Sequence, residues 1–171
     1  MNRPAFTIRQ ATEADYGQLC DLFAELDALH REARPDLFRK PEGPPRQRSY
    51  IARLIASPSS AILVAAQTDA RILHGFATLI GHEKPATIVS PSRRVVEIDN
   101  LCVRAGARRQ GIGASLVEQA NEWAMRKGYD QIELSVHAFN EDARKFYEAS
   151  GFETALLRMT RVAEGQADVS P

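Results

Sequence analysis

The sequence predicts a single α/β domain with a mixed, mostly antiparallel sheet of about six to seven strands, flanked by about four helices. A chain of 171 residues is long enough for one substantial hydrophobic core but short for two. Stretches in which apolar and polar residues alternate are interspersed with stretches whose apolar residues recur at helical spacing. The sequence contains no internal repeat or low-complexity segment that would indicate a second domain.

The N-terminal third is predicted to contain one strand and two helices. Apolar and polar residues alternate over 6–12, which indicates a strand. The stretch TEAD begins with Thr12, an N-cap residue followed three positions later by an acid, and leucines at helical spacing then predict a helix to Leu29. Residues 31–48 are rich in proline and charge and are expected to form a loop, followed by a short helix over 49–57.

The middle of the chain is predicted to be rich in strands. Two antiparallel strands are expected over 60–67 and 72–81, joined by a polar turn at 68–71. A second loop is expected over 82–94. The stretch RVVEIDNLCVR at 94–104 is then a strong candidate for a strand.

The C-terminal part is predicted to alternate helices and strands. Helical spacing follows Gly111 and ends at Gly128, a favourable residue just beyond a helix C-terminus. A strand is expected over 131–136, and Asn140 is the N-cap of a helix over 140–150. Further expectations are one or two final strands within 152–162 and a polar tail over 163–171.

The composition argues against several partners. Lys+Arg and Asp+Glu both number 22, so no global field favours nucleic acid or an anionic membrane surface, and any basic site must be local. The longest apolar run, AILVAA at 61–66, is far too short to span a bilayer. Residues 1–15 contain no apolar core typical of a signal peptide. We therefore expect a cytoplasmic protein that acts on neither nucleic acid nor membrane.

Cysteine and histidine usage predicts no metal site. Cys20 and Cys102 lie far apart and form no ligand-spacing motif, so two reduced thiols are expected. The four histidines, His30, His74, His82 and His137, are equally scattered.

The stretch RRQGIG at 108–113 joins a predicted strand to a predicted helix. The free N–H groups and the dipole of a helix N-terminus attract anions, and glycine allows the backbone to approach a phosphate closely. A dinucleotide fingerprint would need a third glycine where Leu116 stands, and the Gly-Lys-Ser/Thr of a Walker loop is absent. A phosphate-binding turn and a plain tight turn both remain open.

Two longer stretches in the right order resemble one known family. VRAGARRQGIGA, residues 103–114, resembles the pyrophosphate-binding motif of the GCN5-related N-acetyltransferases, although the frequent proline after the strand is missing. NEDARKFYEASGF, residues 140–152, resembles the second signature of that family. The resemblance implies an N-acetyltransferase (GNAT) domain over 1–162, with the characteristic splayed sheet, and acetyl-CoA as co-substrate.

The resemblance also implies which residues bind the co-substrate. The pantetheine arm would pair with backbone groups of the strand that ends at Val103, and the pyrophosphate would lie on the N–H groups of the following turn. Asn140 and the aromatic pair after it would lie near the cofactor arm. The implied set is Leu101, Cys102, Val103, Arg108, Arg109, Gln110, Gly111, Ile112, Gly113, Ala114, Asn140, Phe146 and Tyr147.

Tyr147 is the leading catalytic candidate, because the family uses a tyrosine here as general acid toward the departing thiolate. A phenol pKa near 10 suits proton delivery to a thiolate of roughly comparable basicity. The alternative is that Ala143, Phe146 and Tyr147 form only an apolar helical stripe.

Glu97 and Asp99 are the candidates for the general base. They are two residues apart on one predicted strand, so both side chains are expected on the same face, where they could share a water and a proton. Asp99 matches the family pattern better than Glu97. The alternative is a solvated strand face without a catalytic role.

Three other features have weaker assignments. Cys102 could suggest a covalent route, but no histidine is placed to activate it, and packing is the favoured interpretation. His137 lies either near the acceptor or simply in solvent. The loop over 31–48 is expected to help form the wall of the acceptor site.

The sequence therefore predicts direct transfer of an acetyl group from acetyl-CoA to a primary amine. A backbone N–H near Val103 would stabilise the oxyanion. The alternatives are an acyltransferase that acts on a protein N-terminus or lysine, and a non-catalytic acyl-CoA-binding regulator. The acceptor is a small molecule or a peptide, and a homodimer is possible.

Overall fold

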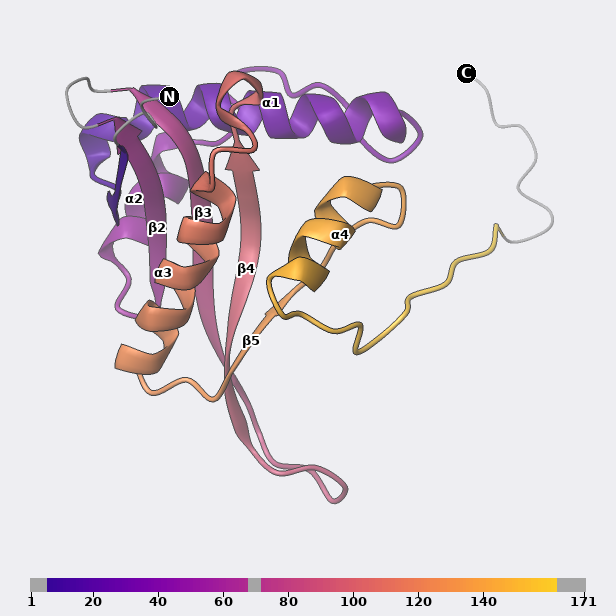
Figure 1. Cartoon of the computed structure of the whole chain (residues 1–171). Helices are drawn as coiled ribbons and strands as arrows, with labels where there is room; N and C mark the ends of the chain where they lie inside the picture. Colours follow the sequence, from indigo (N-terminus) through magenta and orange to yellow (C-terminus); the bar gives the residue numbers. More distant parts are fainter. Residues whose placement is uncertain (1–5, 68–71, 163–171) are drawn as a thin grey trace.

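The computed structural model, which describes residues 6–67 and 72–162, contains one five-stranded sheet in the order β1-β2-β3-β4-β5 (Figure 1). All neighbouring strands are antiparallel except β4 and β5, which are parallel. The strands are β1 (Phe6–Gln10), β2 (Ser60–Gln67), β3 (Leu73–Lys84), β4 (Arg93–Val103) and β5 (Gln131–Leu134). The predicted mixed, mostly antiparallel α/β sheet is confirmed, with fewer strands than expected.

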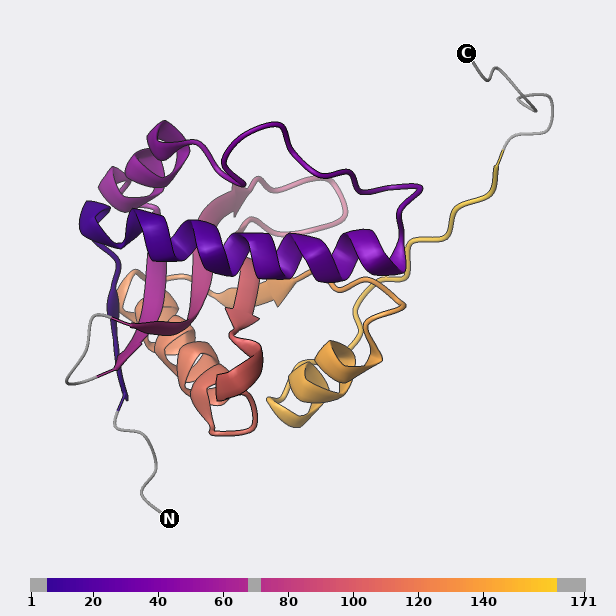
Figure 2. The ribbon, with the colours of Figure 1, turned by 90° about the horizontal axis from the view of Figure 1, so that it is seen from above.

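Four α-helices flank this sheet, as expected. They are α1 (Tyr16–Ala33), α2 (Arg48–Ala56), α3 (Ile112–Arg126) and α4 (Glu141–Ala149), and short 3₁₀ turns stand at Glu13–Asp15 and Ala105–Ala107. Seen from above, α1 and α2 lie on one face of the sheet, whereas α3 lies on the other (Figure 2). None of the helices in the described residues is long and apolar enough to cross a membrane.

The sheet is buried on both faces, which explains the nearly continuous apolar run of β2. Alternate strand residues contribute to two separate cores. One core packs against the apolar stripe of α3, namely Ile112, Leu116, Ala120, Trp123 and Ala124. The other packs against α1 and α2 through Leu19, Leu22, Phe23, Ile51 and Leu54.

Several expected boundaries are shifted: α1 continues to Ala33, into the expected loop over 31–48, and β5 ends at Leu134 although a strand over 131–136 was expected. Two other expectations are wrong. β3 and β4 continue as a long hairpin into the expected loop over 82–94, because Glu83 pairs with Arg94 and Lys84 with Arg93 (Figure 1). Conversely, residues 152–162 form no strand, since no other described segment lies in register beside them. The expected turn at 68–71 and the tail at 163–171 lie outside the described residues.

A β-bulge and a strand divergence shape the middle of the sheet. Thr78 pairs with Asn100 but Leu79 pairs with Ile98, so Asp99 is an extra residue in β4. Pairing between β4 and β5 ends at the same point, with Ile98 opposite Leu134. Beyond it, β4 continues to Val103 without a described strand beside its β5 side.

The predicted capping signal at Thr12 forms a polar anchor between β1 and the start of α1. The Thr12 N–H donates to the Asp15 carboxylate at 2.8 Å, and two guanidinium nitrogens of Arg9 donate to the same carboxylate at 2.8 Å each. Asp15 is only 6% exposed, so its charge depends on these donors. The hydrogen bonds from Arg9 lower the pKa of Asp15 below its ordinary value, against the opposing effect of burial.

We expect Asp15→Asn to lower the free energy of unfolding by about 2 kcal/mol at pH 7, because a hydrogen-bonded charged group is lost. The pKa of Asp15 is lower in the folded protein than in the unfolded chain. The stabilisation by this carboxylate is therefore complete above the pKa of the unfolded chain, and it is lost as the pH falls through the pKa of the folded protein. Urea unfolding between pH 7 and pH 3 should therefore show that the difference in free energy of unfolding between wild type and Asp15→Asn decreases as the pH falls. Asp36→Asn is the control, because that exposed ion pair with Arg34 should matter little. A deficit that persists unchanged at pH 3 would contradict this origin.

Candidate active site

The turn between β4 and α3 presents backbone N–H groups to the outside. Gly111 is the N-cap of α3 with a φ of 83°, and Arg109 also has a positive φ, 61°. Left-handed residues that alternate with right-handed ones aim successive N–H groups into one concavity, which binds anions. No side chain caps α3, so the first N–H groups of the helix, at Ile112, Gly113 and Ala114, remain available there.

The side chains of this turn fit a polar ligand. The Oε1 atom of Gln110 is buried and has no hydrogen-bond partner among the described residues, so it is available to a donor from outside the chain. The exposed side chain of Arg109 forms no ion pair with another described residue. The Arg108 side chain instead contacts the protein itself: its Nε donates to the Val103 carbonyl at 3.1 Å, and its Nη2 lies 3.5 Å from the Glu25 carboxylate. The residues present therefore fit a diphosphate, with Arg109 more open to it than Arg108.

Glu25 of α1 holds this turn in place. Its carboxylate accepts a hydrogen bond from the Ala105 N–H at 2.7 Å in addition to its contact with Arg108. Glu25 was not among the residues predicted from the sequence, because its partner lies 80 positions further along the chain.

The two sequence motifs meet at Gly113. A Cβ atom at this position would lie 3.1 Å from Cζ of Phe146, closer than ordinary van der Waals contact. Gly113 therefore allows the Phe146 ring of α4 to pack on the first turn of α3. The second glycine of the pair serves this close approach between helices, whereas Gly111 supplies the left-handed backbone conformation.

Tyr147 lies beside this contact in an aromatic environment. Its ring is 5.1 Å from Phe146 and 5.7 Å from Phe152, measured between centroids. Burial raises the pKa of Tyr147 to about 12, so the phenol stays protonated at physiological pH. Asn140 is the N-cap of the same helix, as predicted, and its Oδ1 accepts from the Ala143 N–H at 3.2 Å.

The end of β4 offers free backbone groups on the side where β5 diverges. The Arg104 N–H donates to the His74 carbonyl of β3 at 2.8 Å. Since backbone groups alternate along a strand, Cys102 also faces β3, whereas Leu101 and Val103 direct their N–H groups to the open side. Val103 and Leu101 have half-buried side chains on the α3 core.

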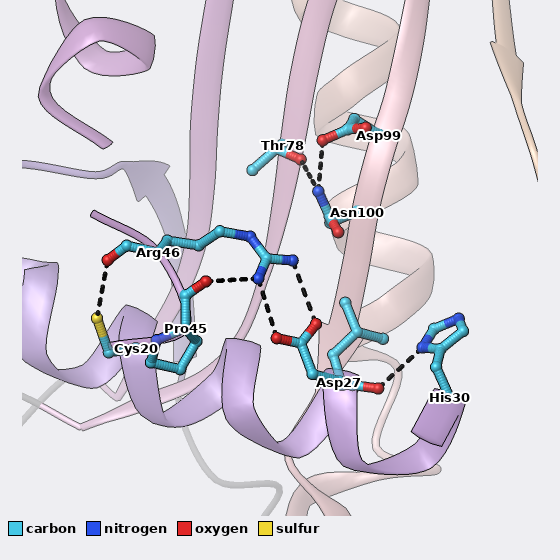
Figure 3. A network of polar contacts seen from close by, with 9 residues as sticks. Cys20, Asp27, His30, Pro45, Arg46, Thr78, Asp99 and Asn100 are labelled. Atoms are coloured by element: carbon cyan, nitrogen blue, oxygen red, sulfur yellow. Dashed lines mark hydrogen bonds and ion pairs between the residues drawn. The ribbon is translucent and has the colours of Figure 1, made fainter. Parts of the chain in front are cut away.

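The two candidate acids have separate partners. Glu97 Oε2 lies 3.3 Å from Nε2 of His82 on the neighbouring strand. Asp99, at the bulge, is exposed and accepts a hydrogen bond from Nδ2 of Asn100, which also donates to Thr78 at 3.1 Å (Figure 3). Each acid therefore has its own partner, and Asp99 is the more accessible of the two.

The loop between α1 and α2 is fixed over this region by Arg46. The guanidinium of Arg46 donates to Asp27 of α1 at 2.9 and 3.2 Å and lies 4.4 Å from the centroid of Phe23. The Arg46 carbonyl in turn accepts from the Cys20 thiol (Figure 3). It also accepts from the Tyr16 hydroxyl at 2.9 Å. The expected loop over 31–48 is therefore anchored along α1, on the face of the sheet from which Asn100 contacts Thr78.

Four rings join this loop to the segment between β5 and α4. His30, Phe38, His137 and Phe139 have neighbouring centroids between 5.3 and 5.7 Å apart. Burial, together with His30 and Arg34, lowers the pKa of His137, so its neutral form is favoured. His137 is thus part of a cluster that includes the RPDLF loop. His30, Phe38 and Phe139 were missed, because only the fold brings these residues together.

Cys102 is a packing residue. It is 5% exposed within the α1–α2 core, and burial raises the pKa of its thiol to about 12. Both cysteines are free, as expected. Because the thiolate is the reactive form, this environment suppresses a covalent route through Cys102.

The two sequence motifs thus meet in an α/β domain, at a turn with available N–H groups beside a divergent strand pair. The sequence matches the Acetyltransferase (GNAT) family over residues 24–152, and the chain belongs to that family. The predicted family membership is confirmed.

Relatives extend over different shares of the chain. An uncharacterized N-acetyltransferase, YhfO of Bacillus subtilis, is 27% identical over 146 residues, which are 85% of this chain and 89% of that protein. Aminoglycoside N(6')-acetyltransferase type 1 of Klebsiella aerogenes is 31% identical over 66% of this chain and 72% of its own length. The chain spans only 22% of the GCN5-related N-acetyltransferase 6 of Arabidopsis thaliana, at 40% identity over 62 residues.

Solved structures share the whole fold. A mutant of the BH1408 protein from Bacillus halodurans has a TM-score of 0.87 at 27% identity, covering 92% of this chain and 99% of that one. The aminoglycoside N-acetyltransferase AAC(6')-Iy in complex with CoA has a TM-score of 0.69 at 17% identity, covering 92% and 99%. At that identity the second likeness shows the fold alone.

We expect Cys102 to resist alkylation by iodoacetamide at pH 8 in the folded protein, because almost none of a thiol with a pKa of about 12 is ionised there. Peptide mass spectrometry should show modification of this residue only after denaturant is added. A Cys102→Ala variant identifies the peptide unambiguously. Rapid modification of native Cys102 would contradict the packing role and reopen the covalent route.

Proposed function

We propose that this protein transfers an acetyl group from acetyl-CoA to a primary amine by direct attack. The observation that carries the proposal is the contact of Phe146 with Gly113, which places the helix of Tyr147 against the anion-binding turn. A binding site for the diphosphate and a proton donor for the departing thiol are thereby held in one rigid unit.

The chain offers a continuous series of binding groups for acetyl-CoA. The N–H groups at the start of α3, with Arg109 beside them, are suited to the diphosphate. The open backbone groups of Leu101 are suited to the amides of the pantetheine arm, which would extend along β4, whereas the Val103 carbonyl already accepts from Arg108. A CoA-bound aminoglycoside acetyltransferase of the same fold supports this choice of ligand.

Asp99 is the proposed base. It is exposed at the bulge, where β4 and β5 begin to diverge, and its carboxylate is oriented by Asn100. It would accept a proton from the attacking amine, directly or through a water, as the N–C bond forms and the C–S bond breaks. Glu97 is the second choice, because His82 already holds its carboxylate.

Tyr147 is the proposed acid. A phenol with a pKa of about 12 is fully protonated at the start of the reaction and can give its proton to the thiolate that leaves. The N–H of Val103, on the open side of β4, is the proposed oxyanion donor. Such a donor typically contributes about 3 kcal/mol to stabilisation of the transition state.

The acceptor is proposed to be a small amine. Relatives and structural neighbours include aminoglycoside acetyltransferases, which favours an amine-bearing small molecule over a protein N-terminus or lysine. The acceptor would approach from the side of Asp99 and the four-ring cluster. Two free thiols are compatible with a reducing cytoplasm as the proposed location.

Release of free thiol from acetyl-CoA across a panel of amines tests the proposal. We expect Tyr147→Phe to lower kcat by about 10²–10⁴-fold, because only the hydroxyl that donates the proton is removed. The Kd for CoA, measured by calorimetry, should change little. Since the pKa of Tyr147 is raised to about 12, the wild-type rate should show no loss from this group up to about pH 10.

Two outcomes would contradict the proposal. Unchanged turnover in Tyr147→Phe would remove the role of the phenol as acid. Tight CoA binding without thiol release for any amine would indicate a regulator that retains the binding turn without the chemistry.

We expect Asp99→Asn to lower kcat by about 100-fold below the pKa of the amine, because the amide cannot accept the proton. Glu97→Gln should lower it by no more than about 3-fold, since that carboxylate is paired with His82. The same thiol-release assay, run from pH 6 to 10, measures both. The loss of kcat in Asp99→Asn relative to wild type should become smaller as the pH rises, because more of the amine is then already neutral. A larger effect at Glu97 would exchange the two assignments.

A further inference from the structure

Thr78 of β3 is a polar residue in an apolar setting. It is 0% exposed, and the residues on either side of it in the strand, Ala77 and Leu79, belong to the α3 core. Phe76, two positions earlier and therefore on the same face as Thr78, belongs to the α1–α2 core. Burial of a hydroxyl among apolar groups costs free energy unless a hydrogen bond compensates for it. Thr78 therefore needs a specific partner.

The three buried polar residues in the described part of the chain have different uses. Asp15 joins β1 to the start of α1, and the Ser60 hydroxyl donates to the Leu54 carbonyl of α2 at 2.8 Å. Both of these residues thus complete local structure. Thr78 Oγ1 instead accepts from a side chain, because Nδ2 of Asn100 on β4 donates to it at 3.1 Å. A buried hydroxyl is thereby assigned to the orientation of one amide side chain.

Asn100 connects this buried hydroxyl to the exposed carboxylate of Asp99. An amide nitrogen carries two N–H donors, and Nδ2 of Asn100 donates both to Thr78 Oγ1 and to Asp99 Oδ2 (Figure 3). The opposite orientation of the amide would place its oxygen against the carboxylate, where neither group could donate. Thr78, Asn100 and Asp99 therefore form a hydrogen-bond series that leads from the core to the surface.

Asp99 depends on this series because the bulge leaves it without a neighbour across the strands. Thr78 pairs with Asn100 and Leu79 pairs with Ile98, so no residue of β3 lies opposite Asp99. Asp99 is exposed, and among the described residues Asn100 is the one donor to its carboxylate. An exposed side chain that lacks such a bond samples several rotamers. The direction of the carboxylate thus depends on Asn100, and that of Asn100 depends on Thr78.

We propose that Thr78 is a positioning residue for acetyl transfer, which acts through Asn100 on Asp99. The inference rests on the proposed role of Asp99 as base and deepens it. A base must lie within hydrogen-bond reach of the proton that it removes, and a displacement of about 1 Å can cost about 100-fold in rate. The proton still passes from the amine nitrogen to Asp99, and neither Thr78 nor Asn100 gains or loses one. Their contribution is to hold the carboxylate in one direction before the amine arrives.

Substitutions of Thr78 test this role in the thiol-release assay at pH 7, with the amine that reacts fastest. Thr78→Val keeps the shape of the side chain but removes its hydroxyl, so we expect kcat to fall about 10-fold while KM for both substrates stays within about 2-fold. Thr78→Ser retains the hydroxyl and should recover most of the lost rate. Ser60→Ala is the matched control, because it removes a buried hydroxyl from the neighbouring strand and should leave kcat unchanged.

A double-mutant comparison separates positioning from a merely structural role at the bulge. Since Thr78 is proposed to act through Asp99, Thr78→Val should cause no further loss of kcat in the Asp99→Asn background. A structural role would instead multiply the two losses. Urea unfolding measures the stability of each variant separately.

The contact itself can be followed without turnover. In NMR spectra of isotope-labelled protein, the side-chain amide signals of Asn100 should shift in Thr78→Val. They should keep nearly the wild-type positions in Thr78→Ser and in Ser60→Ala.

Three results would overturn the inference alone: full kcat in Thr78→Val beside a reduced kcat in Asp99→Asn, multiplied losses in the double variant, and an equal loss of kcat in Ser60→Ala. Unchanged kcat in Asp99→Asn would overturn the proposed base and this inference together. The Asp99→Asn variant therefore distinguishes failure of the proposed mechanism from failure of the role of Thr78.

Discussion

The candidate site depends on the point at which β4 and β5 stop pairing. Two parallel strands held together to Ile98 and Leu134 would leave no room between them if they continued side by side. At that same level the extra residue Asp99 interrupts the alternation of β4. Leu101 and Val103 consequently join Val96 and Ile98 on the α3 core, although a regular strand would place them on the opposite face. The bulge thus allows a strand with buried side chains to present free backbone groups beside an exposed acid.

The anion-binding turn is the second consequence of this arrangement. β4 continues to Val103, past the end of its pairing with β5, and the turn that follows leads through the 3₁₀ turn Ala105–Ala107 to the N-terminus of α3. Glu25 and Arg108 hold the turn to α1 and to the end of β4. Phe146 then fixes α4 on Gly113 from the other side. Three elements that are distant in the sequence therefore keep the turn in place without a capping side chain on α3.

Much of the fold could be predicted because local patterns decide it. The apolar stripe from Ile112 to Ala124 specifies both the presence of α3 and the face that it buries. The hairpin through Glu83 and Lys84 was missed, since polar residues near prolines suggest a loop and only pairing with Arg94 and Arg93 makes them a strand. The strands expected at 152–162 show the opposite error: the alternation is real, but alternation provides no partner strand.

The same distinction applies to the site. The conformation of the turn and the N-cap of the helix that contains Tyr147 could be predicted from contiguous motifs, because each motif specifies its own backbone conformation. The partners of individual side chains could not be predicted in the same way. Arg108 donates to the Val103 carbonyl, and Glu97 lies beside His82 on the neighbouring strand. Glu25 and Asn100 depend on contacts between distant elements and leave no local signal.

The proposed acceptor side consists mainly of side chains, whereas the proposed co-substrate side consists mainly of backbone groups. Backbone groups dominate around the turn, where Gly111 has a left-handed conformation and Gly113 leaves room for the Phe146 ring. Around Asp99 the surface is made of side chains: an Asp27–Arg46 pair that anchors the loop, and four aromatic rings that connect it to the segment before α4. The lowered pKa of His137 favours the neutral form of this ring within the cluster. We propose that these rings and the exposed carboxylate of Asp99 suit an acceptor that carries an ammonium group next to an apolar or flat body. Changes in the loop around Phe38 would alter that preference without disturbing the turn, because the two surfaces share no side chain.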